Sequence, residues 1–338
     1  MTDVAVIAVD GGNSKTDLAL VGADGDLLAL VRGPLSSPHH VGASGALEVI
    51  DNLLGEALEK ASVAYAPDGP IAEIAQLLMA GVDFPSEEEE FEAAAAACGW
   101  ARRTVVGNDT FAVLRAGSER GWGVAVVCGA GINCVGVAPD GRHARFPALG
   151  WITGDWGGGY DVGIAAVTAA ARSQDGRGPR TSLEQTVPRH FGVSTPLALA
   201  EAFHRGELPQ RRVAELPRLV FQEAAHDAVA AAIVERVATE VATFARAAMS
   251  RLGLEHEPVE VVLGGGLLQS GDGRLTAAIE TGLKEAGAAI AVRTALLPPV
   301  AGAALLGLDA LGAPREAKER LREQMGAAAE RVAEAEVV

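Results

Sequence analysis

The N-terminal part of the chain alternates apolar runs with glycine-containing turns. Residues 4–9 are all apolar, and apolar patterns return at residues 17–21 and 27–31. Runs of this length between turn residues are typical of buried β-strands. The Asp24-Gly25 dipeptide separates the second run from the third and favours a tight turn. The sequence therefore predicts three successive strands.

Helix and strand signals then alternate along the chain. Leucine and isoleucine recur at helical spacing in residues 42–62, and residues 77–83 predict a strand that opens into a loop. The carboxylates that follow Pro85 favour a helix start, where they interact with the helix dipole. Helical patterns dominate residues 181–251, and a charged amphipathic helix is predicted for residues 314–338. This alternation is typical of an α/β protein.

A carboxylate and two glycines directly follow the first predicted strand. Gly11 and Gly12 allow backbone N–H groups to approach an anion, because no Cβ stands in the way. Asp10 would hold Mg²⁺ through water, since this ion gives up its hydration shell reluctantly. The spacing fits neither a P-loop nor a dinucleotide-binding fingerprint. The candidate phosphate-binding residues of the turn are Gly11, Gly12, Asn13, Ser14, Lys15 and Thr16.

The same strand, glycine turn and strand recur at residues 124–137. The second turn contains Gly129, Ala130 and Gly131, and Asp140-Gly141 then takes the place of Asp24-Gly25. An internal duplication explains this repeat most simply. An ordinary glycine turn is the alternative for either hairpin alone. Two such hairpins could hold a nucleotide polyphosphate from both sides.

These motifs resemble those of the sugar kinase, Hsp70 and actin superfamily. Within it, the chain resembles the BadF/BadG/BcrA/BcrD-type ATPases, which include N-acetylglucosamine kinase and bacterial glucosamine kinase. The resemblance covers nearly the whole chain. Residues 10–16 and 128–131 correspond to two phosphate motifs, residues 261–267 to the adenosine motif, and residues 107–110 and 298–304 to two connecting segments.

The resemblance implies an α/β chain with a duplicated actin-like (ribonuclease H-like) ATPase fold, in which two lobes surround a nucleotide cleft. We expect an N-terminal lobe at 1–115 with a C-terminal helix at about 310–338. A C-terminal lobe is expected at 116–309, with a helical insertion at about 173–250. The implied cofactors are ATP and Mg²⁺, bound by the turn residues above, by Asp10, and by Gly129, Ala130, Gly131, Gly265 and Gly266.

Asp109 is the candidate catalytic base. A carboxylate within hydrogen-bond reach of a hydroxyl can accept its proton during phosphoryl transfer. Asp109 follows the predicted strand at residues 104–106, at the edge where open α/β sheets bind ligands. The alternative is that Asp109 only caps the helix that begins near Thr110. Asn108 could supply that cap instead.

The resemblance also implies a set of sugar contacts. Ser37 and His39 lie in the loop at residues 33–42, which corresponds to the family's segment that closes over the sugar. Asp155 suits the binding of vicinal hydroxyls, although a turn-forming Asp is the alternative. Trp156 stands where amino-sugar kinases usually carry an acidic residue. The remaining substrate candidates are Asp83, Asn108, Asp109 and Ile132.

Charge and cysteine content narrow the class of protein. The 338 residues carry a formal net charge of −16, which argues against nucleic acid or an anionic membrane as a partner. The three cysteines lack the paired spacing of a zinc site or a disulfide framework. The first residues show no signal-peptide pattern. We expect a cytoplasmic protein with a small-molecule partner, and the C-terminal helix could support a homodimer.

The motifs together predict an ATP-dependent amino-sugar kinase. It would phosphorylate glucosamine, or N-acetylglucosamine, at the 6-hydroxyl, with glucosamine slightly favoured. One alternative is an activator ATPase of a 2-hydroxyacyl-CoA dehydratase, which needs exposed cysteines to hold an iron–sulfur cluster. Another is a non-catalytic sugar-sensing protein, which would carry a DNA-binding helix-turn-helix.

Overall fold

The structure consists of two compact units. It is a computed structural model that describes residues 3–63, 69–284 and 289–337. The first unit comprises Met1–Gly123 and Ala295–Val338, and the second comprises Val124–Thr294. Each unit contains a five-stranded sheet.

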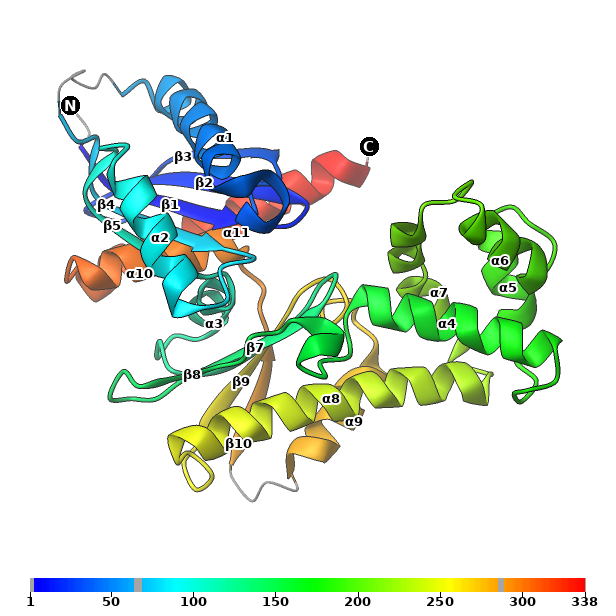
Figure 1. Cartoon of the computed structure of the whole chain (residues 1–338). Helices are drawn as coiled ribbons and strands as arrows, with labels where there is room; N and C mark the ends of the chain where they lie inside the picture. Colours follow the sequence, from blue (N-terminus) through cyan, green and yellow to red (C-terminus); the bar gives the residue numbers. More distant parts are fainter. Residues whose placement is uncertain (1–2, 64–68, 285–288, 338) are drawn as a thin grey trace. The chain divides into compact units, whose positions relative to one another are not determined.

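The first unit has a mixed sheet in the order β3-β2-β1-β4-β5. The three N-terminal strands pair antiparallel, whereas β1–β4 and β4–β5 pair parallel. Helices cover both faces of this sheet (Figure 1). The strands are β1 (Val4–Gly11), β2 (Lys15–Gly22), β3 (Leu27–Pro34), β4 (Ala72–Met79) and β5 (Ala101–Asn108). The helices are α1 (Pro38–Ala61), α2 (Pro85–Ala96), α3 (Thr110–Gly117), α10 (Pro299–Ala310) and α11 (Arg315–Val337).

The alternation of side chains along β1 builds two hydrophobic cores. Ile7 and Val9 face one side of the sheet and pack with the apolar face of α1. Val6 and Ala8 face the other side and pack with α10. Because both faces are covered, β1 is a nearly continuous apolar run, as expected of a central strand. Its first polar side chain, Asp10, comes at the end of the strand.

The second unit repeats the strand order of the first. Its sheet runs β8-β7-β6-β9-β10, so a hairpin and a third strand are again followed by two parallel strands. This repetition supports the duplication predicted from the sequence. The strands are β6 (Gly123–Cys128), β7 (Ile132–Val137), β8 (His143–Arg145), β9 (Val259–Gly264) and β10 (Ile290–Thr294).

Helices make up most of the second unit between β8 and β9. The long α8 contacts β7 and β8 and packs against α9. The helices are α4 (Gly159–Gln174), α5 (Leu183–His190), α6 (Pro196–His204), α7 (Pro217–Glu223), α8 (Ala228–Leu252) and α9 (Gly273–Lys284), with short 3₁₀ turns η1 (Gly150–Ile152) and η2 (Gln210–Glu215). None of the helices in the described ranges is long and apolar enough to span a membrane.

Two local features differ from the sequence-based expectation. The helix α1 begins at Pro38, so His39 lies in a helical turn and not in a loop. Gly42, with φ of 71°, then interrupts the helix, which is why the periodic pattern is visible only after it. In addition, α10 belongs to the first unit, because it packs against β1 and α3. The expected lobe boundary had placed residues 298–309 in the second lobe.

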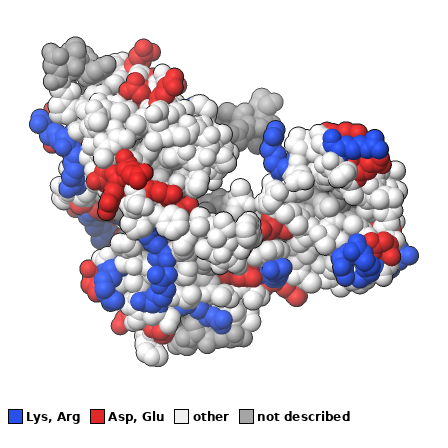
Figure 2. All heavy atoms as spheres, viewed as in Figure 1, with Lys and Arg blue, Asp and Glu red and all other residues white. Residues whose placement is uncertain are grey.

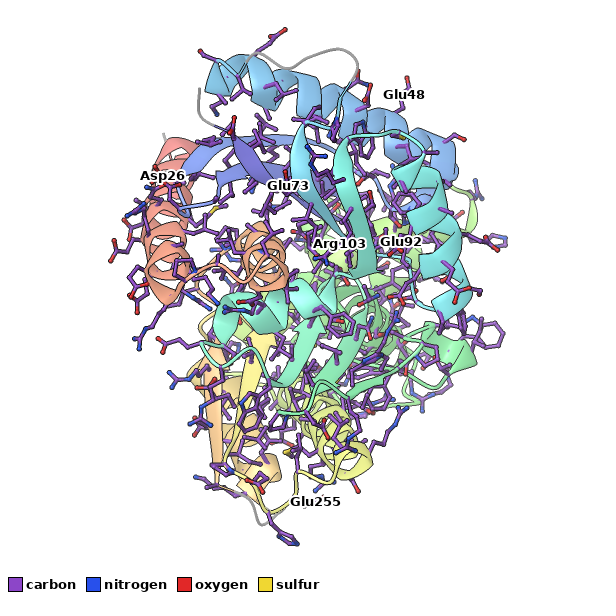
Figure 3. All side chains as sticks on the ribbon, turned by 90° about the vertical axis from the view of Figure 1, so that its left-hand side faces the viewer. Asp26, Glu48, Glu73, Glu92, Arg103 and Glu255 are labelled. Atoms are coloured by element: carbon purple, nitrogen blue, oxygen red, sulfur yellow. The ribbon has the colours of Figure 1, made fainter. Side chains whose placement is uncertain are left out.

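The charged segments at the edges of the first unit have structural roles. Figure 2 shows carboxylates gathered over α2. Glu87 accepts hydrogen bonds from the backbone N–H groups of Asp83 and Phe84 at 2.8 and 3.0 Å, so it satisfies donors at the start of α2. At another edge Asp26 lies beside α11 (Figure 3), and its carboxylate accepts a hydrogen bond from Gln324 at 3.3 Å. The first contact stabilises the start of α2, and the second joins α11 to the segment before β3.

The packing of α10 on α3 predicts a position that tolerates no side chain. A Cβ on Gly302 would lie 1.8 Å from the carbonyl oxygen of Ala112. We expect Gly302→Ala to lower the free energy of unfolding by about 1–3 kcal/mol, as overpacking does. Gly55→Ala is the control, because its Cβ would meet nothing within 4 Å and alanine stabilises a helix. If denaturant unfolding shows that Gly302→Ala is as stable as Gly55→Ala or more stable, the result would contradict this packing.

Candidate functional site

A row of charged side chains crosses the first sheet at the end of β1. Asp10 is opposite Asp17 on β2, and Asp17 is opposite Arg32 on β3. Arg32 donates to both carboxylate oxygens of Asp17, at 2.7 and 3.2 Å. Desolvation, then the charges of Asp109 and Asp17, raise the pKa of Asp10 to about 8, whereas Lys15 and Arg32 act in the opposite direction. Bringing carboxylates together costs free energy unless a cation joins them.

This carboxylate environment fits Mg²⁺. The ion prefers hard oxygen ligands and retains several waters, so one or two protein carboxylates suffice. Within the described ranges, no group of three or more His, Cys, Asp or Glu side chains could enclose a metal.

The first glycine hairpin divides into an exposed tip and a buried base. The backbone N–H of Gly12 donates to the carbonyl of Lys15 at 2.9 Å and closes the turn. Asn13, Ser14 and Lys15 are exposed at the tip. Thr16 is buried, and its hydroxyl donates to the Ser36 hydroxyl at 2.7 Å. Thr16 was predicted to contact phosphate, but in the structure its buried hydroxyl supports the turn from inside.

Gly11 is also part of the base of this hairpin. A Cβ at Gly11 would lie 2.4 Å from the Cε atom of Met79 and 2.7 Å from the Ser36 hydroxyl. A Cβ at Gly12 would lie 2.8 Å from the carbonyl oxygen of Lys15. Both glycines are therefore required by close packing within this unit, independently of any ligand.

The end of β5 leaves the Asp109 carboxylate out of the helix cap. Asn108 is 3% exposed, and its side-chain oxygen accepts from the backbone N–H and the hydroxyl of Thr110 at 3.1 and 2.6 Å. Its side-chain NH₂ donates to Val82 O at 3.2 Å and to Asp83 Oδ1 at 2.9 Å. Asp109, at the N-cap position, makes no side-chain cap hydrogen bond. Asn108 thus takes the capping role that the sequence had left open.

The surroundings of Asp109 favour a proton acceptor. Burial and then the neighbouring charge of Asp83 raise the pKa of Asp109 to about 6, although the backbone N–H groups of Thr110 and Asp109 oppose the shift. A carboxylate with a pKa near 6 is ionised at neutral pH and is a stronger base than an ordinary Asp. Perturbed carboxylates of this kind are typical of functional sites.

Ser37 lies at the start of α1 with an unsatisfied hydroxyl. The residue is buried, and its Oγ has no hydrogen-bond partner within the part of the chain that the structure describes. It borders Gly81, whose Cβ would lie 2.7 Å from this oxygen and 2.9 Å from the His39 ring. Gly81 has φ of +78°, a conformation that glycine adopts without strain. A buried polar atom without a partner is a candidate ligand contact.

The second glycine hairpin is joined to the start of α4. The carbonyl of Gly129 accepts from the backbone N–H of Gly159 at 2.8 Å, and the carbonyl of Ala130 accepts from Tyr160 at 3.1 Å. Gly129, Ala130 and Gly131 are exposed. A Cβ at Gly129 or Gly131 would meet nothing within 4 Å. The backbone at these two glycines is therefore open to an incoming group.

The turn after β9 packs on the end of β6, beside the second hairpin. Gly265 has φ of +83°, and its Cβ would lie 2.3 Å from the carbonyl oxygen of Cys128. The same carbonyl accepts from the backbone N–H of Leu267 at 3.2 Å. Gly266 is exposed. The structure thus brings the predicted adenosine motif next to the predicted second phosphate motif.

The stretch that precedes α4 is held by its own polar groups. Thr153 donates its hydroxyl to the Asp155 carboxylate, and the backbone N–H of Asp155 donates to the Gly150 carbonyl at 2.9 Å. Asp155 is half-buried in this turn. Ile132 is only 4% exposed and lies against Gly157. Ile132 therefore shapes this segment by packing.

Two interactions near these residues were not predicted. One is the Asp17–Arg32 pair, and the signal for it was a pair of opposite charges inside two otherwise apolar strands. The other joins Trp156 to α8, where the Arg236 guanidinium lies 3.9 Å from the centre of the indole ring. The two residues are far apart in the sequence, so no local pattern indicates this contact.

The comparison with known families agrees with these motifs. The model of the BadF/BadG/BcrA/BcrD ATPase family matches residues 7–307. The chain belongs to this ATPase family. It is 29% identical over 269 residues to the N-acetylmuramic acid/N-acetylglucosamine kinase of Clostridium acetobutylicum, covering 78% of this chain and 86% of that protein. It is 25% identical over 318 residues to the N-acetyl-D-glucosamine kinase of Dictyostelium discoideum, covering 91% of this chain and 99% of that protein.

Two solved structures share the fold of this chain. A protein of Chromobacterium violaceum assigned as an N-acetylglucosamine kinase matches with a TM-score of 0.71 and 25% identity, covering 91% of this chain and 100% of that one. The ROK hexokinase of Thermus thermophilus matches with a TM-score of 0.50 and 18% identity, covering 90% and 96%. The predicted actin-like ATPase fold is confirmed.

The raised pKa of Asp10 predicts an unusual pH dependence of stability. Between about pH 4 and pH 8 the folded ATPase binds a proton at Asp10 that the unfolded chain has released, so this group makes stability fall as pH rises. Asp10→Asn removes that effect. We expect metal-free Asp10→Asn to gain melting temperature over wild type at pH 8, by at least about 2 °C, and to gain less at pH 5. A gain that is independent of pH would contradict this electrostatic account.

Proposed function

We propose that the protein is an ATP-dependent phosphotransferase that transfers the γ-phosphoryl group to the 6-hydroxyl of an amino sugar. The observation that carries the proposal is Asp109, which directly follows β5, makes no side-chain cap hydrogen bond and has a pKa raised to about 6. In addition, the chain belongs to an ATPase family, and the curated relatives of this chain are named kinases.

The residues divide the work of the reaction among them. Asp109 accepts the proton of the sugar hydroxyl as that oxygen bonds to the γ-phosphorus, while the bond to the bridging oxygen of ADP breaks. Asn108 positions Asp109, because the Asn108 side chain, and not that of Asp109, caps the start of α3. Asp10 holds Mg²⁺, which screens the phosphate charges when it is bound. The exposed tips of both glycine hairpins supply donors for the phosphates, and Gly265 and Gly266 contact the adenosine.

N-acetylglucosamine is the first candidate for the substrate. The sequence had slightly favoured glucosamine, but both curated relatives are named for N-acetylglucosamine. Ser37, with a buried hydroxyl that has no partner among the described residues, is a candidate contact to a sugar hydroxyl. Asp83, Asn108 and Asp155 provide further acceptors and donors for hydroxyls, and His39 borders Ser37 at Gly81. We place the reaction in the cytoplasm, where ATP is supplied.

The activator-ATPase alternative finds no support in the cysteines. Cys128 and Cys134 are buried in β6 and β7, and Cys98 is exposed in the first unit. A cluster shared between subunits needs exposed cysteines in a common loop.

A substrate panel tests the proposed reaction directly. ADP release would be followed by a coupled assay with glucosamine, N-acetylglucosamine, N-acetylmannosamine, glucose and 1,6-anhydro-sugars. We expect turnover with an amino sugar, highest with N-acetylglucosamine, and little ADP release without sugar. Sugar-independent hydrolysis together with a blank panel would contradict the proposal and favour the activator-ATPase alternative.

The role of Asp109 predicts a matched pair of results. Asp109→Asn should lower kcat by about a hundredfold or more, because the amide cannot accept the proton. Its melting temperature should stay close to that of wild type or rise, because Asn108 supplies the cap of α3. In wild type, kcat/KM should fall as pH decreases through about 6, where Asp109 becomes protonated. Turnover of the variant within a few-fold of wild type would show that another group is the base.

The second hairpin predicts a loss of nucleotide binding without a loss of folding. Gly131→Val should weaken the binding of ATP by about tenfold or more in calorimetry, because a side chain blocks the approach of the phosphates to the backbone. The fold should tolerate it, since a Cβ there meets nothing within 4 Å. Gly12→Val is the contrasting variant, because its Cβ would strike the Lys15 carbonyl and should also reduce stability. Unchanged ATP affinity in Gly131→Val would mean that this glycine serves only the turn.

A further inference from the structure

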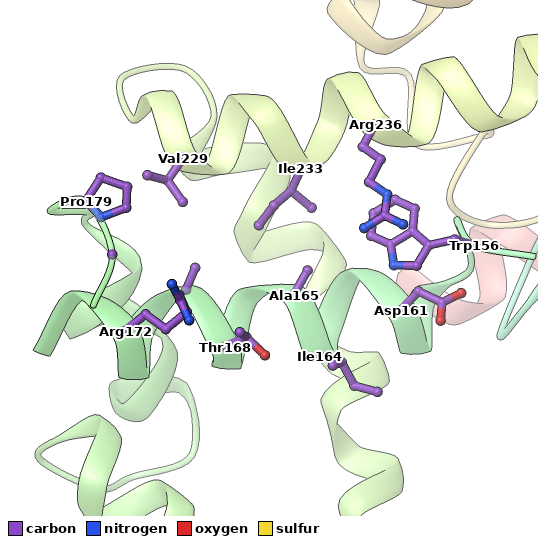
Figure 4. A pocket seen from close by; sticks show the side chains of 12 residues that line it. Trp156, Asp161, Ile164, Ala165, Thr168, Arg172, Pro179, Val229, Ile233 and Arg236 are labelled. Atoms are coloured by element: carbon purple, nitrogen blue, oxygen red, sulfur yellow. The ribbon is translucent and has the colours of Figure 1, made fainter. Parts of the chain in front are cut away.

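A trough of about 510 Å³ lies between α4 and α8 in the second unit. Figure 4 shows side chains from the two helices facing each other across it. On α4 the lining residues recur every three or four positions, so they form one face of the helix. The same holds for α8. The lining of the trough includes Ile164, Ala165, Thr168 and Arg172 of α4, Val229, Ile233 and Arg236 of α8, and Trp156 and Pro179.

Small side chains keep the trough open. Ala165 and Ala169 stand in the middle of the α4 face, where leucine or phenylalanine would fill the space between the helices. Of the other residues between the two ends, Ile164, Val229 and Ile233 are apolar, and Thr168 contributes a hydroxyl at the exposed rim. The floor therefore offers hydrophobic surface to a ligand. Eleven residues separate Asp161 from Arg172 along α4, which corresponds to roughly 16 Å at 1.5 Å per residue.

A guanidinium group stands at each end of the trough. At one end Arg236 stacks on Trp156 and forms an ion pair with Glu240, although the 3.8 Å from its Nε to that carboxylate is too long for a hydrogen bond. At the other end Arg172 donates one hydrogen bond, to the carbonyl of Arg177 at 2.8 Å. Each guanidinium carries five N–H donors, so most of them can reach a ligand or water.

The lining also contains one carboxylate, which offsets part of this positive charge. Asp161 accepts hydrogen bonds from the backbone N–H groups of Gly157 and Gly158, at 3.1 and 3.3 Å, and so caps α4. The lining still carries more positive than negative charge, whereas the whole chain has a formal net charge of −16. An apolar floor between two arginines therefore suits a molecule with an apolar body and an anionic head.

The trough also adjoins the segment that carries Asp155. Residues 155–157 have no regular secondary structure, and Asp155 and Trp156 are consecutive. Asp155 bonds to Thr153 within its own turn, whereas Trp156 enters the trough. An occupant packed against the indole would restrict this segment and thereby the carboxylate next to it.

We propose that this trough binds an amphipathic small-molecule anion, which steadies the segment carrying Asp155. The effect on sugar affinity rests on the function proposed above, but the binding itself does not. Decanoate and decyl phosphate serve as probes, because they share an apolar chain and differ in the anionic head.

Calorimetry on the full-length protein, below the concentrations at which the probes form micelles, tests the binding. We expect saturable one-to-one binding of decanoate, of decyl phosphate, or of both, and at least about tenfold weaker binding of decanol and decylamine. Ala165→Phe should abolish binding, and Arg236→Gln should weaken it about tenfold. Thr168→Phe blocks the trough from its exposed rim and replaces Ala165→Phe if that variant does not fold. Arg205→Gln, in an exposed ion pair with Glu201 on α6, is the control and should bind as wild type does.

Three results would overturn the binding site. The first is equal affinity for decanol and the anions, which would remove the role of the arginines. The second is undiminished binding in the blocked variants, and the third is no binding of either anion to wild type. Because calorimetry needs no turnover, these results are independent of the proposed kinase reaction. Kinetics then test the coupling: saturating anion should lower the KM for sugar a few-fold in wild type and not in Ala165→Phe, and an unchanged KM would overturn it.

Discussion

The hydrogen bonds of the Asn108 side chain are the constraint on which the first unit's chemistry depends. Its oxygen satisfies the start of α3, and its NH₂ group fixes the loop after β4 through Val82 and Asp83. Asp109 is thereby released from capping and held near other carboxylates. The raised pKa values of Asp10 and Asp109 follow first from burial and then from that crowding. Burying these neighbouring carboxylates lowers the stability of the folded protein, and a bound cation would restore part of that stability.

The duplicated hairpins use glycine for two different physical reasons. Gly11 and Gly12 lie so close to Met79, Ser36 and Lys15 that no side chain would fit. Gly129 and Gly131 have open space where a side chain would be, so packing does not explain them. Without side chains, these two residues leave the backbone accessible from outside. The second hairpin therefore has the more accessible backbone, although the first has the richer set of polar residues.

Much of the fold could be predicted because its signals are local. The strands β1 to β3 follow from apolar runs and turn residues, and the candidate site follows from residues at strand ends. Contacts between distant residues could not be predicted. The burial of Thr16 depends on Ser36, and the position of Trp156 depends on Arg236. The early start of α1 was missed because Gly42 interrupts the helical pattern. The membership of α10 in the first unit depends on its packing against α3, which the sequence does not display.

The central claim is that the γ-phosphoryl group reaches the 6-hydroxyl of an amino sugar. Two-dimensional ³¹P–¹H correlation NMR on a reaction with ATP, Mg²⁺ and N-acetylglucosamine observes that bond directly. The account predicts a new phosphomonoester signal coupled to the two protons on C6, which appears with wild type and is nearly absent with Asp109→Asn. A signal coupled to the anomeric proton, or inorganic phosphate as the sole product, would contradict it.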